Sequence, residues 1–467
     1  MPYDVVVVGG GVGGLTVAAL LSARGLSVCL LERQSQVGGC IGRVEHGGYN
    51  FEPGMGLYSS WGEREIYDRI FSELRVDLPA TSVVTSNYVV RLAGHTDVTL
   101  FKSENEFSAE LRRAFPESPD QAVEFYKLVD AVAEPPKRGL FGRVFGRSPS
   151  STTASATALD VASTTAKPFQ RFIDAQLKAF LHTSIERCSF AAACRALRIP
   201  RQNLYSFNHG VAELGDRLAE SFKSAGGVIR LNSPALRIAY DETGKAIGVD
   251  LLSGETIVAT KAIVSNLTCW DTYGRLIGLQ RTPTEIKNEL KTKQSRGAYV
   301  IYASVEDAAL NRLPARNFLV ADPDVEEDHF AAEFTMSVAT STSERLYPVT
   351  LKTSTEVNPW FAFQTSEEDF EQRDQLALEE FWTQLHKTVP ELGAAIEVIE
   401  TANPRTYYDE TRRKLGMVMG SETTPDTNPD FRTSIPNLFM VGDSTGIAPN
   451  LESVSQSALL LANHLTE

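Results

Sequence analysis

The sequence is poor in cysteine and histidine, and neither residue type is arranged as a disulfide framework or a metal site would require. Its 467 residues include five cysteines and seven histidines. No two cysteines have C-x-x-C spacing, and no histidines have the H-E-x-x-H spacing of a zinc protease. We therefore expect no metal site, no disulfide framework and a reducing, cytoplasmic environment.

The sequence is also short of positive charge. It has 45 Lys and Arg against 59 Asp and Glu, which gives a formal net charge of −14. Proteins that bind nucleic acid need clustered positive charge, so this balance argues against a nucleic-acid partner. The chain is 42% hydrophobic, and since single cores stop growing near roughly 250–300 residues, we expect two lobes.

Long hydrophobic runs are missing as well. No run of about 18 apolar residues occurs, so no membrane-spanning helix is expected. The stretch from Val5 to Leu21 is apolar enough to suggest a signal peptide. Glycines interrupt it repeatedly and residues 1–4 carry no basic side chain, so we expect a strand followed by a helix instead.

What this stretch does contain is a glycine-rich turn. Tyr3–Val8 is predicted to be a buried parallel strand, and Gly9, Gly11 and Gly14 then form a G-x-G-x-x-G motif. The first glycine permits the tight turn, the second lets a pyrophosphate approach the backbone, and the third allows close helix–strand packing. The helix N-terminus would offer free N–H groups and a partial positive charge to the phosphates.

A second strand, Ser27–Glu32, completes one βαβ unit and ends in a carboxylate. This carboxylate lies about 20 residues after the glycines, where it would accept hydrogen bonds from ribose hydroxyls. The sequence has no second G-x-G-x-x-G motif. The pattern therefore predicts one dinucleotide-binding unit at the N-terminus.

Turn signals and periodicity predict the further elements. Gly47-Gly48 indicates a tight hairpin between Arg43–His46 and Tyr49–Glu52. Helical patterning recurs over Phe169–Leu197 and Val211–Ser224. The remaining expected strands are Val228–Asn232, Ala235–Tyr240, Ala246–Leu252, Thr256–Thr260, Ala262–Ser265 and Asn437–Val441, and a last helix, N-capped by Asn450, is expected to reach Leu465.

Residues 135–166 have a different composition from the rest of the chain. A basic and apolar run, residues 137–147, precedes a stretch rich in Ser, Thr and Ala. We expect a flexible loop or lid here. Because apolar residues recur at near-helical spacing among Lys and Arg, residues 137–147 are also a candidate for peripheral contact with an anionic membrane; a solvated loop is the alternative.

Gly38-Gly39 follow Glu32 closely, and the stretch from Asp4 to Gly39 resembles the N-terminal signature of the two-dinucleotide-binding-domain flavoproteins. Within this amine-oxidase-type superfamily, the chain is most similar to the phytoene desaturase, carotenoid isomerase and retinol saturase group. Three more segments carry the resemblance: Gly48–Gly54, Asn203–Leu218 and Pro436–Ser444. The resemblance implies an α/β fold, with a Rossmann-like FAD-binding domain and an inserted α+β substrate domain.

The resemblance also implies which residues hold FAD. Asp443 and nearby amides would bind its ribityl-phosphate end, and Ala235 would contact adenine through the main chain. Cys40 stands where the family commonly has a basic residue, and Arg43 is the candidate to replace it. The expected cofactor-binding residues are Gly9, Gly11, Val12, Gly13, Gly14, Glu32, Arg33, Gly38, Gly39, Arg43, Ala235, Gly442, Asp443, Ser453 and Val454.

No catalytic acid–base constellation stands out, and an enzyme whose cofactor performs the hydride chemistry does not need one. His209, which follows a predicted strand, is a candidate to approach the flavin. Tyr205 and Glu52 are weaker candidates, as is Arg43.

The expected FAD-binding domain is discontinuous and combines residues 1–105, 203–275 and 405–467. Residues 106–202 and 276–404 would form the substrate domain. The resemblance predicts an FAD-dependent oxidoreductase that desaturates, saturates or isomerises an apolar polyene or isoprenoid. Its electron acceptor is not identified by any motif.

Two alternatives remain. One is an amine-oxidase- or protoporphyrinogen-oxidase-like flavoenzyme, although Thr423–Ile435 offers a single aromatic residue, Phe431, toward an aromatic cage. The other is a non-enzymatic escort for prenylated proteins on the same fold. The intact glycine motif, Glu32 and Asp443 argue against that second alternative.

Overall fold

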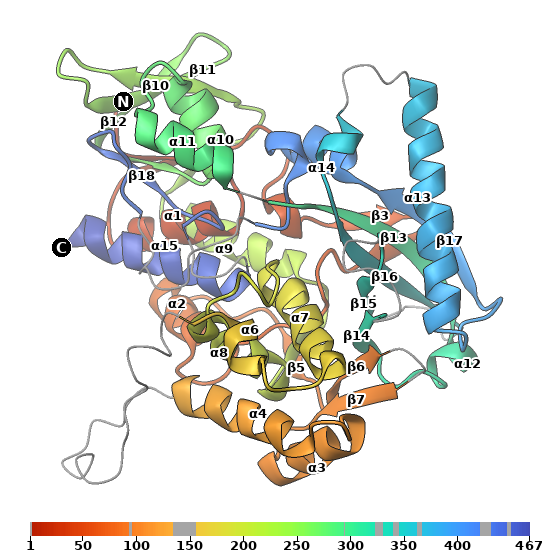
Figure 1. Ribbon diagram of the computed structural model, residues 1–467. Helices are drawn as coiled ribbons and strands as arrows, with labels where there is room; N and C mark the ends of the chain where they lie inside the picture. Colours follow the sequence, from red (N-terminus) through yellow and green to blue (C-terminus); the bar gives the residue numbers. More distant parts are fainter. Residues whose placement is uncertain are drawn as a thin grey trace, which may run out of the picture.

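The computed structural model describes residues 2–92, 96–133, 156–293, 295–322, 330–339, 345–361, 367–420, 431–445 and 450–467. Two seven-stranded sheets organise this part of the chain, and helices pack around both (Figure 1). Both termini lie in the lobe built on the first sheet. None of the described helices combines the length and the apolar composition that crossing a bilayer requires.

The first sheet is parallel at its centre. Its strands are β10 (Ala235–Tyr240), β11 (Ala246–Leu251), β12 (Thr256–Ser265), β1 (Tyr3–Val8), β2 (Val28–Leu31) and β9 (Val228–Arg230) in that order, with β18 (Leu438–Met440) beside β12. β1 is parallel to β2 and β12, and β18 is parallel to β12. All four residues of β2 and the last four of β1 are buried, as expected for strands covered on both faces.

Helices from several parts of the chain pack into one core with this sheet. They are α1 (Val12–Ala23), α2 (Ile66–Leu74), α9 (Ala212–Ser224) and α15 (Leu451–Thr466). α1 is buried along nearly its whole length and lies between α9 and α15. Arg24 ties the same region together, because its guanidinium donates to Asn463 of α15 at 2.8 Å and to Glu73 of α2 at 2.6 Å. The last helix is therefore an integral part of the first lobe.

The second sheet is mixed and lies beside the first lobe (Figure 1). Its order is β17 (Ile396–Ala402), β13 (Gly297–Glu306), β16 (Leu346–Thr355), β15 (Glu333–Val338), β14 (Asn317–Ala321), β6 (Tyr88–Leu92) and β7 (Thr96–Leu100). Phe381 and Leu385 of α13 (Glu367–Thr388) are fully buried in the core beside this sheet. A separate core, rich in Phe, forms where the helices α3 (Glu104–Ala114), α4 (Pro119–Ala133), α6 (Ala158–Ala162), α7 (Lys167–Leu181) and α8 (Phe190–Arg198) meet.

Several smaller elements connect these parts. The hairpin of β3 (Val44–His46) and β4 (Tyr49–Phe51) is confirmed, and both central glycines have positive φ, 56° at Gly47 and 81° at Gly48. β5 (Thr81–Val83) pairs with β8 (Tyr205–Phe207). The remaining helices are α10 (Cys269–Asp271), α11 (Thr284–Thr292), α12 (Asp307–Leu310) and α14 (Pro404–Thr411), with a π-helix at Thr272–Gly278 and 3-10 turns at Gly39–Ile41, Ile199–Arg201, Asn358–Trp360 and Lys414–Gly416.

Three expectations about local structure are wrong in detail. Thr256–Ser265 is one strand, not two, because its first half pairs with β11 and its second half with β1 and β18. The helical stretch 169–197 is divided into α7 and α8, since α7 ends at His182 in the left-handed conformation. Residues 156–166 do not form a loose loop: Thr157 caps α6, whose Ala158 and Ala162 are fully buried.

The rest of the expected lid, including the basic and apolar run at 137–147, lies outside the described residues. The division into two discontinuous domains stays a proposal. β6 and β7 fall within residues 1–105, which the sequence assigns to the dinucleotide-binding domain, yet they pair within the second sheet. The sequence of a short strand such as β6 or β7 carries no local signal for which of two sheets the strand will join.

Candidate cofactor and substrate cavity

The glycine-rich turn has the geometry that its three glycines predict. Gly9 directly follows β1 and has φ 99°, and Gly11 stands at the N-cap of α1. A Cβ atom on Gly14 would lie 2.1 Å from the Gly9 carbonyl oxygen. A side chain at Gly14 would therefore push α1 away from β1, and the N-terminus of α1 could no longer face the turn.

Glu32 is held beside this turn by two backbone donors. Its carboxylate accepts from the Gly10 amide and from the Gln34 amide, each at 2.7 Å. β2 places the carboxylate at the carboxyl end of the parallel sheet, the edge at which α/β folds bind their ligands. The two contacts fix the carboxylate at the end of the cavity where a ribose would lie.

The double glycine packs directly on the first glycine loop. Gly38 has φ 115°, and its amide donates to the Gly10 carbonyl at 2.8 Å. A Cβ atom on Gly39 would lie 3.2 Å from the Gly11 Cα atom. The two loops thus meet backbone to backbone, which keeps this wall free of side chains.

Asn266 joins the first glycine loop to the C-terminal motif, and sequence reasoning missed it. Its side-chain amide donates to the Gly9 carbonyl at 3.3 Å, while a Cβ atom on Gly442 would lie 2.8 Å from its Oδ1 atom. Gly442 also has φ 113°, so both its backbone conformation and the close approach of Asn266 require glycine here. Asn266 directly follows β12, so its position at the carboxyl end of a parallel strand was a signal that could have identified it.

The closing helix begins as predicted. The Asn450 side chain accepts from the Ser453 amide at 2.9 Å and caps α15. Val454, in the first turn, packs near Gly13 of α1, where a Cβ atom would lie 3.2 Å from its Cγ1 atom. The N-termini of α1 and α15 therefore lie close together, and both offer partial positive charge at this place.

Asp443 has a protein partner that the sequence did not reveal, the guanidinium of Arg413. Asp443 holds the pKa of Arg413 above its usual range, against the opposing effect of burial. A second carboxylate, Asp271, accepts from the neighbouring Lys414 amide at 3.1 Å. The loop after α14 is thereby fixed against the first lobe.

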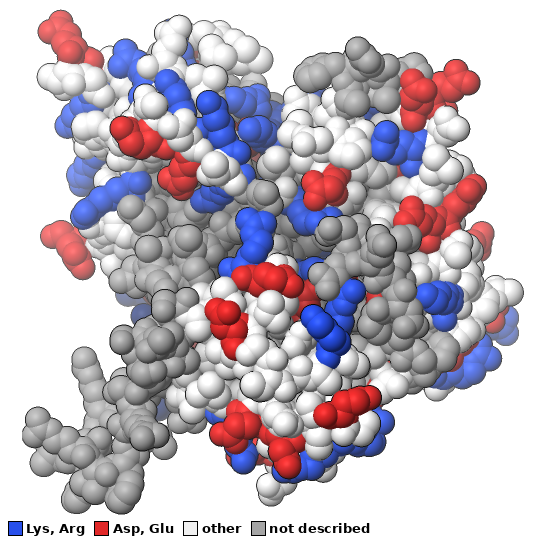
Figure 2. Space-filling model, in the orientation of Figure 1, with Lys and Arg blue, Asp and Glu red and all other residues white. Residues whose placement is uncertain are grey.

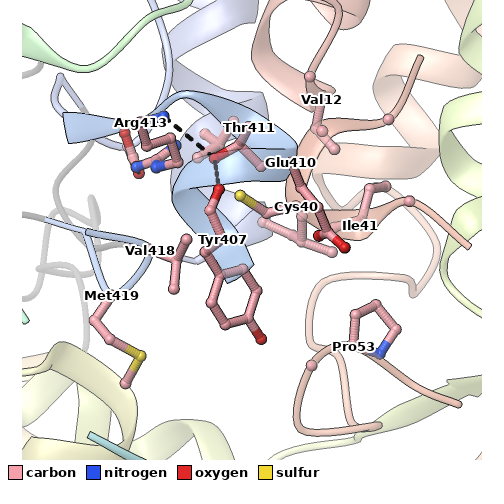
Figure 3. Close-up of a pocket in the computed structure, with 18 of the residues that line it drawn as sticks. Val12, Cys40, Ile41, Pro53, Tyr407, Glu410, Thr411, Arg413, Val418 and Met419 are labelled. Atoms are coloured by element: carbon pink, nitrogen blue, oxygen red, sulfur yellow. Dashed lines mark hydrogen bonds and ion pairs between the residues drawn. The ribbon is translucent and has the colours of Figure 1, made fainter. Parts of the chain in front are cut away.

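α14 itself is well defined by local sequence. Asn403 caps it in a capping box with Thr406, and Pro404 occupies the first turn. At the other end, the Thr411 hydroxyl donates to the Tyr407 carbonyl at 2.6 Å and accepts from the Arg413 amide at 3.3 Å. Figure 3 shows these two bonds as dashed lines, with Cys40 facing the same helix and the Tyr407 ring extending away from it into the pocket.

These parts border one cavity of about 1280 Å³. Single-ligand pockets typically measure about 300–1,000 Å³, so this space can hold a dinucleotide together with a second molecule. Among the expected cofactor-binding residues, all but Gly14 and Ser453 line it. The glycine walls, the two helix N-termini and the fixed Glu32 carboxylate fit a dinucleotide.

The other end of the cavity reaches the second sheet and α7. Its apolar walls include Tyr88, Phe180, Leu319, Phe334 and Met419. Figure 3 shows Val418 and Met419 bordering the same pocket near Tyr407. An apolar wall that continues from a dinucleotide site into a second lobe is suited to an apolar substrate.

Charged groups at this end are mostly paired. The Lys178 ammonium lies 2.9 Å from both Asp174 and Glu333. Burial, together with the smaller effect of the nearby Lys352 charge, lowers the pKa of His182 to about 3. The Nδ1 atom of His182 is buried and has no hydrogen-bond partner among the described residues, so this imidazole is neutral in the fold.

The weaker candidate residues lie in different places. His209 is exposed, lies 3.3 Å from Glu213 and does not line the cavity. Burial raises the pKa of Glu52, whose carboxylate accepts from the Tyr58 hydroxyl. Arg43 lines the cavity, and its guanidinium lies 3.4 Å from the exposed Asp216 carboxylate. His209 is therefore placed away from the space where a flavin would react.

The outer surface mixes both signs of charge. Figure 2 shows Lys and Arg side chains lying among Asp and Glu side chains on the visible face. Charged residues of the described part of the chain form short-range pairs, such as Arg230 with Glu255 at 2.7 Å and Arg237 with Asp250 at 2.8 Å.

Comparisons with known proteins match both the N-terminal region by itself and larger parts of the chain. Residues 7–74 match the NAD(P)-binding Rossmann-like domain. The chain is 25% identical over 510 residues to the chloroplastic prolycopene isomerase of Daucus carota, covering 99% of this chain and 80% of that protein. It is 24% identical over 318 residues to the all-trans-retinol 13,14-reductase of Homo sapiens, covering 62% of this chain and 51% of that protein.

Solved structures share the whole fold at low identity. An oxidoreductase from Methanosarcina mazei matches with a TM-score of 0.71 and 16% identity, over 98% of this chain and 99% of that one. A putrescine oxidase matches with a TM-score of 0.67 and 14% identity, over 100% of this chain and 99% of that one. The predicted fold class and the family resemblance are thereby confirmed. This chain is homologous to the prolycopene isomerases and all-trans-retinol 13,14-reductases, and it has a Rossmann-like dinucleotide-binding lobe within an amine-oxidase-like fold.

Proposed function

We propose that this protein binds FAD and acts as an oxidoreductase that desaturates, saturates or isomerises an apolar polyene or isoprenoid. The observation that carries the proposal is the single cavity that runs from the glycine loops to the apolar walls of the second lobe. Its homologues are named for prolycopene and for retinol, two polyenes. The similarity to putrescine oxidase extends to the fold alone.

Each part of the chain has a proposed role toward FAD. Gly11 and the N-terminus of α1 would receive the pyrophosphate, and Glu32 would bind ribose hydroxyls. Asp443 would bind the ribityl-phosphate end, with Arg413 holding its carboxylate in place. When bound, the flavin supplies the hydride chemistry, so the protein has to bind the substrate, orient it toward the flavin and exclude water.

The apolar walls support a polyene substrate. Phe180, Leu319 and Phe334 would cover a hydrocarbon chain and keep water from the reacting carbons. The paired state of Lys178 with Asp174 and Glu333 keeps those charges from opposing an apolar ligand.

The first test is the absorption spectrum of the purified protein and of Gly11→Val. A Cβ atom at Gly11 meets Asn266 Nδ2 at 3.0 Å and no other heavy atom within 4 Å, so the variant should fold while its side chain blocks the pyrophosphate. We expect a yellow parent and a colourless variant. A parent that remains free of flavin after incubation with excess FAD would reject the cofactor proposal.

The second test separates the substrate classes. Under anaerobic conditions, a detergent-dispersed carotenoid or retinoid that is desaturated should reduce the oxidised flavin, and one that is saturated should oxidise the reduced flavin. An isomerised polyene should change its double-bond geometry, read by chromatography, with no net change in the flavin spectrum. Soluble amines should leave the flavin spectrum unchanged. Flavin reduction by amines, without any response to polyenes, would favour the amine-oxidase-like alternative.

We further propose a cytoplasmic protein that contacts membranes peripherally through residues 137–147. The support is the mixture of basic and large apolar residues in that run. Cosedimentation with anionic vesicles should fall with salt, and a variant carrying Phe141→Ser, Arg143→Glu and Phe145→Ser should remain in the supernatant. Parent protein that never sediments would reject this contact.

A further inference from the structure

Among the described residues, the Lys and Arg side chains that line the cavity are paired, with one exception. Their partners are the Glu410 carbonyl for Arg33, Asp216 for Arg43, Asp174 and Glu333 for Lys178, Asp271 for Arg275, Asp409 for Arg412 and Asp443 for Arg413. Lys352 also lines the cavity. It makes no side-chain hydrogen bond or ion pair with any residue in the described part of the chain.

Lys352 stands at the junction of the two halves of the cavity. It lies in the middle of β16, between Val300 of β13 and Thr335 of β15. Its charge acts on Cys40, which follows the double glycine of the first lobe, and on His182 at the end of α7. The ammonium is therefore positioned between the dinucleotide end and the apolar substrate end.

An unpaired ammonium in this position is costly. Withdrawal from water disfavours a charged group that has no partner, and burial accordingly lowers the pKa of Lys352. The neighbouring His182 imidazole carries no negative charge that could compensate the ammonium. β16 is paired with β13 on one side and with β15 on the other, and the Lys352 side chain lines the cavity. A partner for the ammonium would therefore have to be a molecule in the cavity.

We propose that Lys352 binds an electron-rich oxygen of a molecule held in this cavity. The position beside His182 and α7 favours an oxygen carried by the substrate, which would then be an isoprenoid with a carboxylate, aldehyde or alcohol group and not a pure hydrocarbon. A carbonyl oxygen of the flavin ring is the other source of the same chemistry. The substrate assignment rests on the proposed function; the oxygen-binding role of Lys352 does not.

The experiment compares Lys352→Met, which keeps the length of the side chain without its charge, with Lys352→Arg, which keeps the charge. Lys261→Met is the matched control, because Lys261 lies at the surface, 3.3 Å from Asp4. Dissociation constants are measured for FAD with each apoprotein. With each FAD-loaded protein they are measured for retinoate, for retinol and for the hydrocarbon in which a methyl group replaces the oxygen function.

The parent should bind retinoate and retinol more tightly than the hydrocarbon. Lys352→Met should lose retinoate affinity by roughly tenfold or more, the scale of one charge-assisted hydrogen bond, with unchanged affinity for the hydrocarbon. Lys352→Arg and Lys261→Met should retain most of the retinoate affinity. The ligand-free Lys352→Met protein should melt at the same temperature as the parent or higher, because an unpaired charge has been removed.

The outcomes separate the two sources and the two proposals. A loss of FAD affinity in Lys352→Met, with equal retinoid binding, assigns the oxygen to the flavin. Equal affinities of parent and Lys352→Met for all four ligands would overturn the inference. A parent that binds no isoprenoid at all contradicts the proposed function, while the FAD measurements still test Lys352.

Discussion

At the scale of single residues, one substitution at Asp443 should change both the stability of the fold and the affinity for FAD. Its carboxylate pairs with Arg413, and we propose that it also binds FAD. Asp443→Ala should weaken FAD affinity by roughly tenfold or more, because a charge-assisted hydrogen bond contributes about 1.5–3 kcal/mol. It should also lower the free energy of unfolding, since Arg413 loses its partner. Fluorescence titration and chemical denaturation measure the two effects.

The double variant Asp443→Ala/Arg413→Met separates these effects. Removing both charges should restore part of the lost stability, while FAD affinity stays low. Folded Asp443→Ala protein with the affinity of the parent would show that the carboxylate serves Arg413 alone.

His182 predicts an acid-sensitive fold. Its pKa is about 3 in the folded state against 6.5 for the unperturbed side chain, so the unfolded chain binds a proton that the folded chain does not between these values. The free energy of unfolding should therefore fall as pH drops from about 6.5 toward 3, by up to about 1.4 kcal/mol per pH unit from this residue. His182→Asn keeps a residue suited to the left-handed conformation and should show a shallower pH dependence. If chemical denaturation shows the same change in the free energy of unfolding with pH in both proteins, this role of His182 is disproved.

At the scale of elements, the contact between β1 and α1 depends on Gly14. Gly14→Ala places a Cβ atom 2.1 Å from the Gly9 carbonyl oxygen, so α1 must move and the proposed FAD site should be lost together with stability. We expect several kcal/mol of destabilisation, the scale of severe overpacking. Gly274→Ala is the control, because no heavy atom lies within 4 Å of its added Cβ atom. Circular dichroism melts and flavin content should change in the first variant and remain near parent values in the second.

At the scale of the whole molecule, the cavity links the two lobes. Residues of β1, β2 and α15 line one side, and residues of α7, β15 and β16 line the other. FAD at about 100 times its dissociation constant should stabilise the binding-competent fold by about 2.7 kcal/mol. Hydrogen exchange should then slow around Gly9–Gly14 and, with a polyene also bound, around Lys178–His182. Protection confined to the first lobe with both ligands present would contradict a shared cavity.

The sequence by itself determined the elements whose structure depends on neighbouring residues. The glycine turn after Tyr3–Val8, the Gly47-Gly48 hairpin and the Asn450 cap all appear as predicted. In each, a backbone conformation or a cap needs a particular residue type within a few positions. The family resemblance supplied the fold class, and the comparisons confirm it.

Tertiary structure decided the contacts between distant residues. Asn266 meets Gly9 and Gly442, Arg413 meets Asp443, and Lys352 is left without a protein partner in the described part of the chain. No pattern of local propensity identifies such partners, because the residues are brought together by β-strand order and by packing between lobes. The physical reason is that a side chain's charge state and function depend on which groups surround it after folding, and those groups come from segments 30 residues apart for Arg413 and Asp443 and 257 residues apart for Asn266 and Gly9.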